Sequence, residues 1–122
     1  MSREIINRKK VEWQRASCLG LETDLLYAAR TELVLEGLTY NHLRRICFSC
    51  PIQKECLQVG TAYEQYGFWG GLSEDERRHI YAGKFDTQVM AGLRRDLEML
   101  GKQLGTLTAI VRSVQRDFTF NK

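Results

Sequence analysis

Four cysteines are the residues of this chain best suited to chemistry, and three of them are clustered. Cys47, Cys50 and Cys56 form the pattern C-x2-C-x5-C, and Cys18 is the only other cysteine. Thiolates bind soft metal ions and iron–sulfur centres, and a C-x2-C turn directs two sulfurs at one point. Four such ligands fit either a cubane iron–sulfur cluster or a tetrahedral zinc ion. The spacing alone does not choose between these centres.

Two disulfide bonds are the alternative use of four cysteines, and the sequence argues against them. Disulfides belong to oxidising compartments, which a chain usually reaches with a secretory signal. Half of the first ten residues are charged, and they lack the apolar stretch of such a signal. No run approaches the ~18 apolar residues of a membrane span. We therefore expect a cytoplasmic protein whose cysteines bind metal.

The size and charge of the chain predict one domain with an appendage that is only mildly basic. The chain has 122 residues and a formal net charge of +3. From residue 84 onward it has seven Lys or Arg and four Asp or Glu, which accounts for the whole excess. Because the two signs are mixed, we interpret this segment as a solvated helical face. Weak phosphate contacts are the most that it offers to DNA.

The elements that must position the cysteines are predicted to be helices. A single proline and little β-branched alternation favour an all-α fold. A short helix beginning at Tyr40 would deliver Cys47, and Pro51 would open the next helix. The predicted helices of this part of the chain span residues 3–15, 24–38, 40–46 and 52–66.

A glycine-rich segment follows the last cysteine and contains two large aromatic residues. Glycine permits positive φ and close backbone approach, so the segment predicts a tight turn that fixes both aromatics. A tryptophan held in this way fits an interface anchor as well as a core plug, and the turn by itself does not decide. The segment consists of Gly67, Phe68, Trp69, Gly70 and Gly71.

The start of another helix follows this turn directly. Ser73 and Glu76 have the types and the spacing of a capping box, in which each side chain satisfies a free amide of the first helical turn. Acidic residues at this end and arginines further on suit the helix dipole. Gly83 is predicted to end the helix.

These motifs together resemble the WhiB-like family of transcription regulators of actinobacteria and their phages. The resemblance runs from Trp13 to Arg78 and rests on C-x2-C-P-x4-C-L followed by G-x-W-G-G-L-S-x-x-E-R-R. It implies a small all-helical fold in which the four cysteines hold a [4Fe-4S] cluster sensitive to oxygen and nitric oxide. It also implies binding to the C-terminal domain of the primary sigma factor of RNA polymerase.

The same resemblance assigns a surface that faces the sigma factor. The surface falls on Trp69 with its glycine turn, on Trp13 before the first cysteine, and on Leu26 and Tyr27 after it. Leu26 departs from the usual phenylalanine of the family, and the prolines common near this pair are absent. The implied mechanism is recognition without catalysis, in which the cluster holds the helices so that these side chains present an apolar surface.

Other charged residues near the cysteines receive a more ordinary interpretation. Arg44, Arg45 and Lys54 lie close enough in sequence to offset the charge of a cluster, but each alone is more typical of surface charge. His42 and His79 are interpreted as surface or capping residues, because four cysteines already complete a ligand set.

After Gly83 the chain departs from the family, whose members usually continue with a dense basic segment. Here apolar residues recur at alternating spacings of three and four over four heptads. We predict one helix from Met90 to Phe118, whose apolar face is covered by a second copy of the chain, by its own domain or by a partner. The chain is therefore predicted to divide into a domain of residues 1–83 and a C-terminal extension of residues 84–122. The apolar seam consists of Met90, Leu93, Leu97, Leu100, Leu104, Leu107, Val111, Val114 and Phe118.

Two other functions stay open beside that of a non-enzymatic regulator. A thiol–disulfide reductase would use Cys47 and Cys50 as its C-x2-C pair, but the thioredoxin-like βαβ unit that normally carries such a pair is not indicated. A zinc-stabilised adaptor would have no redox role. Iron content and visible absorption would separate the three.

Overall fold

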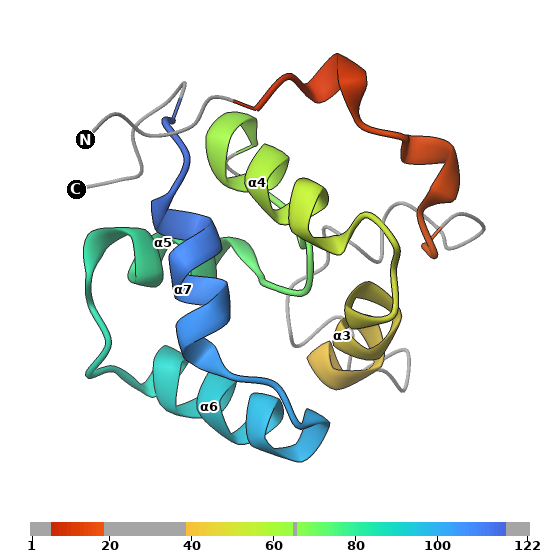
Figure 1. Cartoon of the computed structure of the whole chain (residues 1–122). Helices are drawn as coiled ribbons and strands as arrows, with labels where there is room; N and C mark the ends of the chain where they lie inside the picture. The colour runs from red at the N-terminus through yellow and green to blue at the C-terminus, as the bar shows by residue number, and fades with distance from the viewer. Residues whose placement is uncertain (1–5, 19–38, 65, 117–122) are drawn as a thin grey trace.

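The computed structural model describes residues 6–18, 39–64 and 66–116, which form a helical assembly (Figure 1). The helical class predicted from the sequence is confirmed for this part, and the predicted helix at 24–38 lies outside it. No helix within it is long and apolar enough to cross a membrane. In the described residues the elements are η1 (Arg8–Lys10), η2 (Trp13–Arg15), α3 (Tyr40–Phe48), α4 (Gln53–Tyr63), α5 (Glu74–Ala82), α6 (Gln88–Leu100) and α7 (Leu104–Arg112).

The N-terminal segment does not form the predicted single helix over 3–15. In its described part, η1 and η2 are separate 3-10 turns, and Val11 between them is extended. The reason is tertiary, because the segment is bound to the end of α4: the Tyr63 hydroxyl donates to the carbonyl of Ile6, and Arg8 forms a 2.7 Å ion pair with Glu64. Two 3-10 turns joined by an extended residue span a longer distance than an α-helix of the same length, so this path carries the segment on to the cysteines.

The two helices beside the cysteine cluster form close to where the sequence predicts them. α3 begins at Tyr40, where Thr39 and His42 form a capping box, and it continues two residues past its predicted end. Cys47 therefore lies in the last turn of α3. α4 starts one residue later and ends three residues earlier than predicted, and Pro51 precedes its N-cap residue instead of opening the helix.

α5 has the start and the end that the sequence predicts. The Ser73 hydroxyl accepts from the backbone amide of Glu76 at 3.2 Å, and the Glu76 carboxylate accepts from the amide of Ser73 at 2.9 Å. Gly83 follows the helix with φ +75°, a left-handed conformation that ends it without strain.

The prediction of one helix from Met90 to Phe118 is wrong. α6 stops at Gly101, whose φ is +69°, and the amide of Lys102 closes the helix end by donating to the carbonyl of Leu97 at 2.9 Å. α7 then folds back against α4 and α5. A straight helix would carry most of the apolar seam away from the core, whereas two helices joined at a glycine bury both halves of it.

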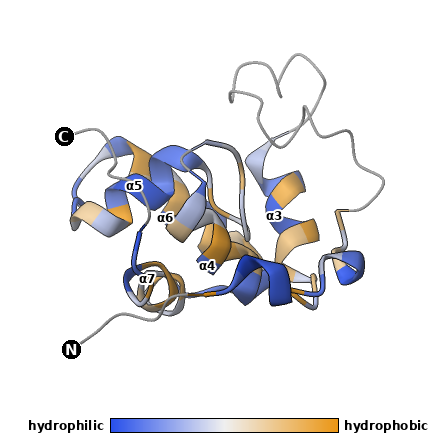
Figure 2. Cartoon of the chain, turned by 90° about the horizontal axis from the view of Figure 1, so that it is seen from above, coloured by the Kyte–Doolittle hydropathy of each residue, from blue (hydrophilic) through white to orange (hydrophobic). Residues whose placement is uncertain are grey.

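One hydrophobic cluster joins the helices. From the sequence, the apolar seam is expected to be covered by a second copy of the chain, by its own domain or by a partner, and its buried residues pack on the chain's own domain. Figure 2 shows hydrophobic and hydrophilic residues on the same helices, as expected of helices with one buried face. The buried members of the cluster come from both sides of Gly83: Leu57, Leu72, Ile80, Met90, Leu93, Leu97, Leu107 and Val111.

We expect Leu97→Ala to lower the free energy of unfolding by about 2–5 kcal/mol, because it leaves a cavity in this cluster. Met99→Ala is the matched control, since Met99 lies on the same helix with 71% of its surface exposed. It should change stability by less than about 0.5 kcal/mol. Urea unfolding followed by far-UV circular dichroism measures both, and equal effects would contradict the packing of α6 on the core.

Candidate metal centre

The clustered cysteines lie at the junction of α3 and α4. Cys47 is in the last turn of α3, Cys50 is in the connection, and Cys56 is in the first turns of α4. Backbone bonds hold the connection tightly: the amide of Cys50 donates to the carbonyl of Cys47 at 3.1 Å, and the amide of Gln53 donates to the carbonyl of Cys50 at 3.2 Å. Local hydrogen bonds therefore fix the C-x2-C turn, as its sequence predicts.

Cys18 reaches the same place from the N-terminal segment. The backbone amide of Ser17 donates to the sulfur of Cys50 at 3.3 Å, which brings Cys18 beside the cluster. None of the four cysteines forms a disulfide. The structure thus gathers four free thiols from segments far apart in the sequence.

The electrostatics of the four thiols show that they are neighbours. Burial, with smaller contributions from the other cysteines, raises the pKa of Cys47 and of Cys56 to about 12. Burial raises the pKa of Cys18 as well, with a second contribution from Cys50. A neutral thiol is favoured at each of these three positions until a cation compensates for burial and for the neighbouring sulfurs.

The chemistry of this donor set fits a soft-metal or iron–sulfur centre. Among the described residues, no three Cys, His, Asp or Glu side chains stand ready to hold a metal ion as they are placed. Protonated thiols have no attraction that would draw them to coordination distance, whereas metal binding deprotonates them and pulls them together. Four sulfurs without a competing His or carboxylate ligand favour iron–sulfur or zinc over harder ions.

The glycine turn lies over the sulfurs. The backbone amides of Gly71 and Gly70 lie near the thiols of Cys47 and Cys56, and each amide lowers the pKa of its cysteine. Gly70 has φ +60°, and a Cβ atom there would lie 2.4 Å from Cβ of Leu57. Only glycine allows this approach, so the turn supplies two amides to the site because it has no side chains there.

The tryptophans assigned to the sigma-facing surface meet beside this turn. The rings of Trp13 and Trp69 are 6.1 Å apart in an edge-to-face arrangement, and both side chains are half-buried. Trp69 packs on Gly60 of α4, where a Cβ atom would lie 2.3 Å from Cβ of the tryptophan. Phe68 points inward and is 6% exposed. Trp69 therefore packs against the core with one part of its ring system and leaves another part exposed.

Two buried arginines hold the ends of the glycine turn, and neither is predicted to be buried from the sequence. Arg77 donates to the carbonyls of Gly60 at 2.6 Å, Glu64 at 2.8 Å and Gly67 at 2.7 Å, so it fastens the start of the turn to the end of α4. Burial lowers the pKa of Arg77 to about 10, and nearby carboxylates and Cys56 counteract this effect.

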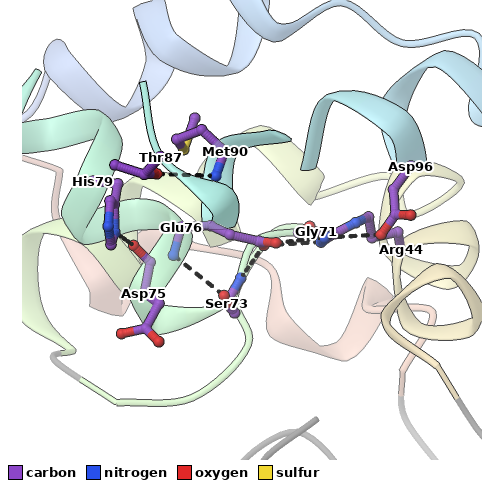
Figure 3. Close-up of polar contacts among 9 residues, drawn as sticks. All are labelled: Arg44, Gly71, Ser73, Asp75, Glu76, His79, Thr87, Met90 and Asp96. Carbon is purple, nitrogen blue, oxygen red and sulfur yellow. Dashed lines mark hydrogen bonds and ion pairs between the residues drawn. The ribbon is translucent and has the colours of Figure 1, made fainter. Parts of the chain in front are cut away.

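Arg44 holds the other end of the turn, and its interpretation as surface charge is wrong. It is fully buried and donates to the carbonyl of Gly71 at 3.2 Å (Figure 3). It also forms two bonds to the carboxylate of Glu76, at 2.9 and 2.5 Å, and an ion pair with Asp96 at 3.2 Å. The capping box revealed Glu76 as a helix-start residue, but no local pattern revealed its buried partner 32 positions away.

The remaining predicted residues divide into two groups. Leu26 and Tyr27 lie outside the described residues. His42 is a capping residue, as predicted, because its ring accepts from the amide of Thr39 at 2.9 Å. The ring of His79 is hydrogen-bonded to the carbonyl of Asp75 within α5.

Comparison with known proteins identifies the family. The model of the transcription factor WhiB family matches residues 13–80, more than half of the chain. WhiD of Streptomyces coelicolor is 35% identical over 72 residues, which cover 57% of this chain and 64% of WhiD. WhiB2 of Mycobacterium tuberculosis is 34% identical over 74 residues, which cover 59% of this chain and 76% of WhiB2. No solved structure matches the chain. The chain belongs to the WhiB family of transcription factors.

We expect Gly70→Ala to destabilise the protein by at least about 2 kcal/mol, because the new Cβ combines a left-handed φ with a clash against α4. Gly105→Ala is the control: a Cβ there meets nothing within 4 Å. It should be neutral or stabilise by up to about 1 kcal/mol. Urea unfolding measures the free energy of unfolding of both variants. A Gly70→Ala protein as stable as the control would contradict the close contact between the glycine turn and α4.

Proposed function

We propose that this chain is a transcription regulator that holds a [4Fe-4S] cluster through Cys18, Cys47, Cys50 and Cys56 and binds the C-terminal domain of the primary sigma factor. The observation that supports it most directly is the 3.3 Å bond from the Ser17 amide to the Cys50 sulfur, which joins the remote cysteine to the cluster of three. Membership of the WhiB family and two relatives named transcriptional regulators support the regulatory role.

The residues around the cysteines have defined tasks in this proposal. When bound, the cluster supplies a redox-sensitive group that links four cysteines from separate segments. The amides of Gly70 and Gly71 offset part of the negative charge of the thiolates, and the buried guanidinium of Arg77 acts on Cys56 with the same sign. The turn and α5 hold these groups beside the cysteines.

The surface proposed for the sigma factor is built from the same elements. Trp69 lies within the glycine turn, directly before Gly70 and Gly71, and Trp13 lies five residues before Cys18. Their edge-to-face contact ties the N-terminal segment to the glycine turn. We propose that Leu26 and Tyr27 complete an apolar patch with these two tryptophans. Half-exposed aromatic rings on a rigid turn lose little entropy on binding, which suits an interface anchor.

The four-cysteine assignment predicts that anaerobically purified protein contains four iron atoms per chain and absorbs broadly in the visible range. Cys18→Ala should lose the iron and the absorption, while Ser17→Ala, a change at the adjacent residue that keeps the backbone amide, should retain them. Iron and zinc analysis with visible spectroscopy measures this. One zinc and no colour would favour the adaptor, and a Cys18→Ala protein with full iron would refute the ligand set.

The interface proposal predicts that Trp69→Ala weakens binding to the sigma domain by about 2 kcal/mol or more, as truncation of a hot-spot residue does. Iron content should stay within error of the wild type. Met99→Ala, on α6 and outside the proposed surface, should bind like the wild type. Calorimetric titration of the iron-loaded proteins measures the affinities. Unchanged affinity, or joint loss of iron and binding, would make Trp69 a packing residue only.

A further inference from the structure

Arg44 is paired with two carboxylates, one more than its charge requires. The Glu76 carboxylate, itself 1% exposed, already neutralises it through two bonds at 2.9 and 2.5 Å. Asp96 of α6 adds a second carboxylate at 3.2 Å from the same terminal nitrogen, with 20% of its side chain exposed. Asp96 lies beyond residue 80, where the match to the family model ends. The C-terminal helices thus contribute a charge to a network that lies otherwise inside the matched segment.

The second carboxylate fixes the direction of the guanidinium. One terminal nitrogen of Arg44 is shared between Glu76 at 2.9 Å and the carbonyl of Gly71 at 3.2 Å, and the other is shared between Glu76 and Asp96 (Figure 3). The Nε atom has no acceptor among the described residues. Without the charge of Asp96, the guanidinium is held mainly by Glu76, and its longest bond, to Gly71, is the one most easily lost.

Gly71 connects this network to the cysteines. Its carbonyl accepts from Arg44 at 3.2 Å, and its amide lies near enough to the thiol of Cys47 to act on it. Its φ is +97°, and the ring of Phe48 lies 2.6 Å from the place of a Cβ atom, so the residue sits in a confined position. A displacement of Gly71 at its carbonyl therefore also changes the position of its amide relative to the sulfur of Cys47.

We propose that Asp96 is a positioning residue through which α6 controls how firmly the chain retains the centre at its cysteines. Asp96 orients Arg44, Arg44 holds the carbonyl of Gly71, and Gly71 aims its amide at Cys47. The inference rests on the proposed function, since it needs a centre at the four cysteines. It assigns the C-terminal helices a task at that centre in addition to their part in the core.

The test uses the full chain, loaded with iron and sulfide without oxygen, as wild type, Asp96→Asn and Glu98→Gln. Glu98 is the matched control, because it is an exposed acid on the same helix. Asp96→Asn should bind the same amount of iron but release it to a ferrous chelator about tenfold faster, since the ion pair with Arg44 is lost. Its visible circular dichroism, which reports cysteine geometry, should change while its far-UV spectrum does not. Glu98→Gln should match the wild type in all three measurements.

The inference is overturned if Asp96→Asn releases iron at the rate of Glu98→Gln with an unchanged visible spectrum. Faster release accompanied by lost far-UV helicity also contradicts it, because Asp96 then only supports the fold. Failure of the proposed function is recognised by a different result: the wild-type chain itself binds no iron. In that case this inference is also overturned. Hydrogen exchange of the peptide that contains Gly71, faster in Asp96→Asn than in Glu98→Gln, supports the stated route.

Discussion

The close approach of the glycine turn to α4 is the constraint on which the rest of the site depends. A Cβ atom on Gly70 would lie 2.6 Å from the backbone of Leu57, so the two backbones touch without side chains between them. This contact brings the amides of Gly70 and Gly71 to the sulfurs and places Trp69 against Gly60 on the same helix. The cysteine site and the tryptophan pair are consequently two sides of one rigid turn.

Two buried arginines make this arrangement rigid. Arg77 binds three carbonyls at the start of the turn, and Arg44 binds the carbonyl of Gly71 at its end. Neither could be buried without acceptors, since an unpaired guanidinium in the interior is strongly destabilising. The buried pair of Arg44 and Glu76 contributes geometry more than net stability, because desolvation offsets most of its attraction. It fixes where the turn lies over α3 and α4.

The C-terminal helices complete the same core. α7 packs on α4 and α5, and α6 packs on α5 while presenting Asp96 to Arg44. The segment that departs most from the family in sequence is therefore coupled to the matched part by an apolar cluster and by one charged contact.

The sequence by itself determined the features whose interactions are local. The C-x2-C turn, the glycine turn, the capping box of Ser73 and Glu76 and the end of α5 at Gly83 all depend on neighbours within a few residues, so type and spacing predict them. The apolar seam also predicted a buried face.

The tertiary structure alone decided which partners the longer-range groups meet. The seam fitted a second chain as well as the chain's own domain, and Gly101 fitted a helix interior as well as a helix end. The N-terminal segment forms two separate 3-10 turns instead of one helix because α4 binds it. Arg44 looks like any surface arginine until α5 and α6 bring two carboxylates to it. A hydrogen bond across tens of residues leaves no periodic or local pattern in the sequence, which is the physical reason that the buried network was not predicted.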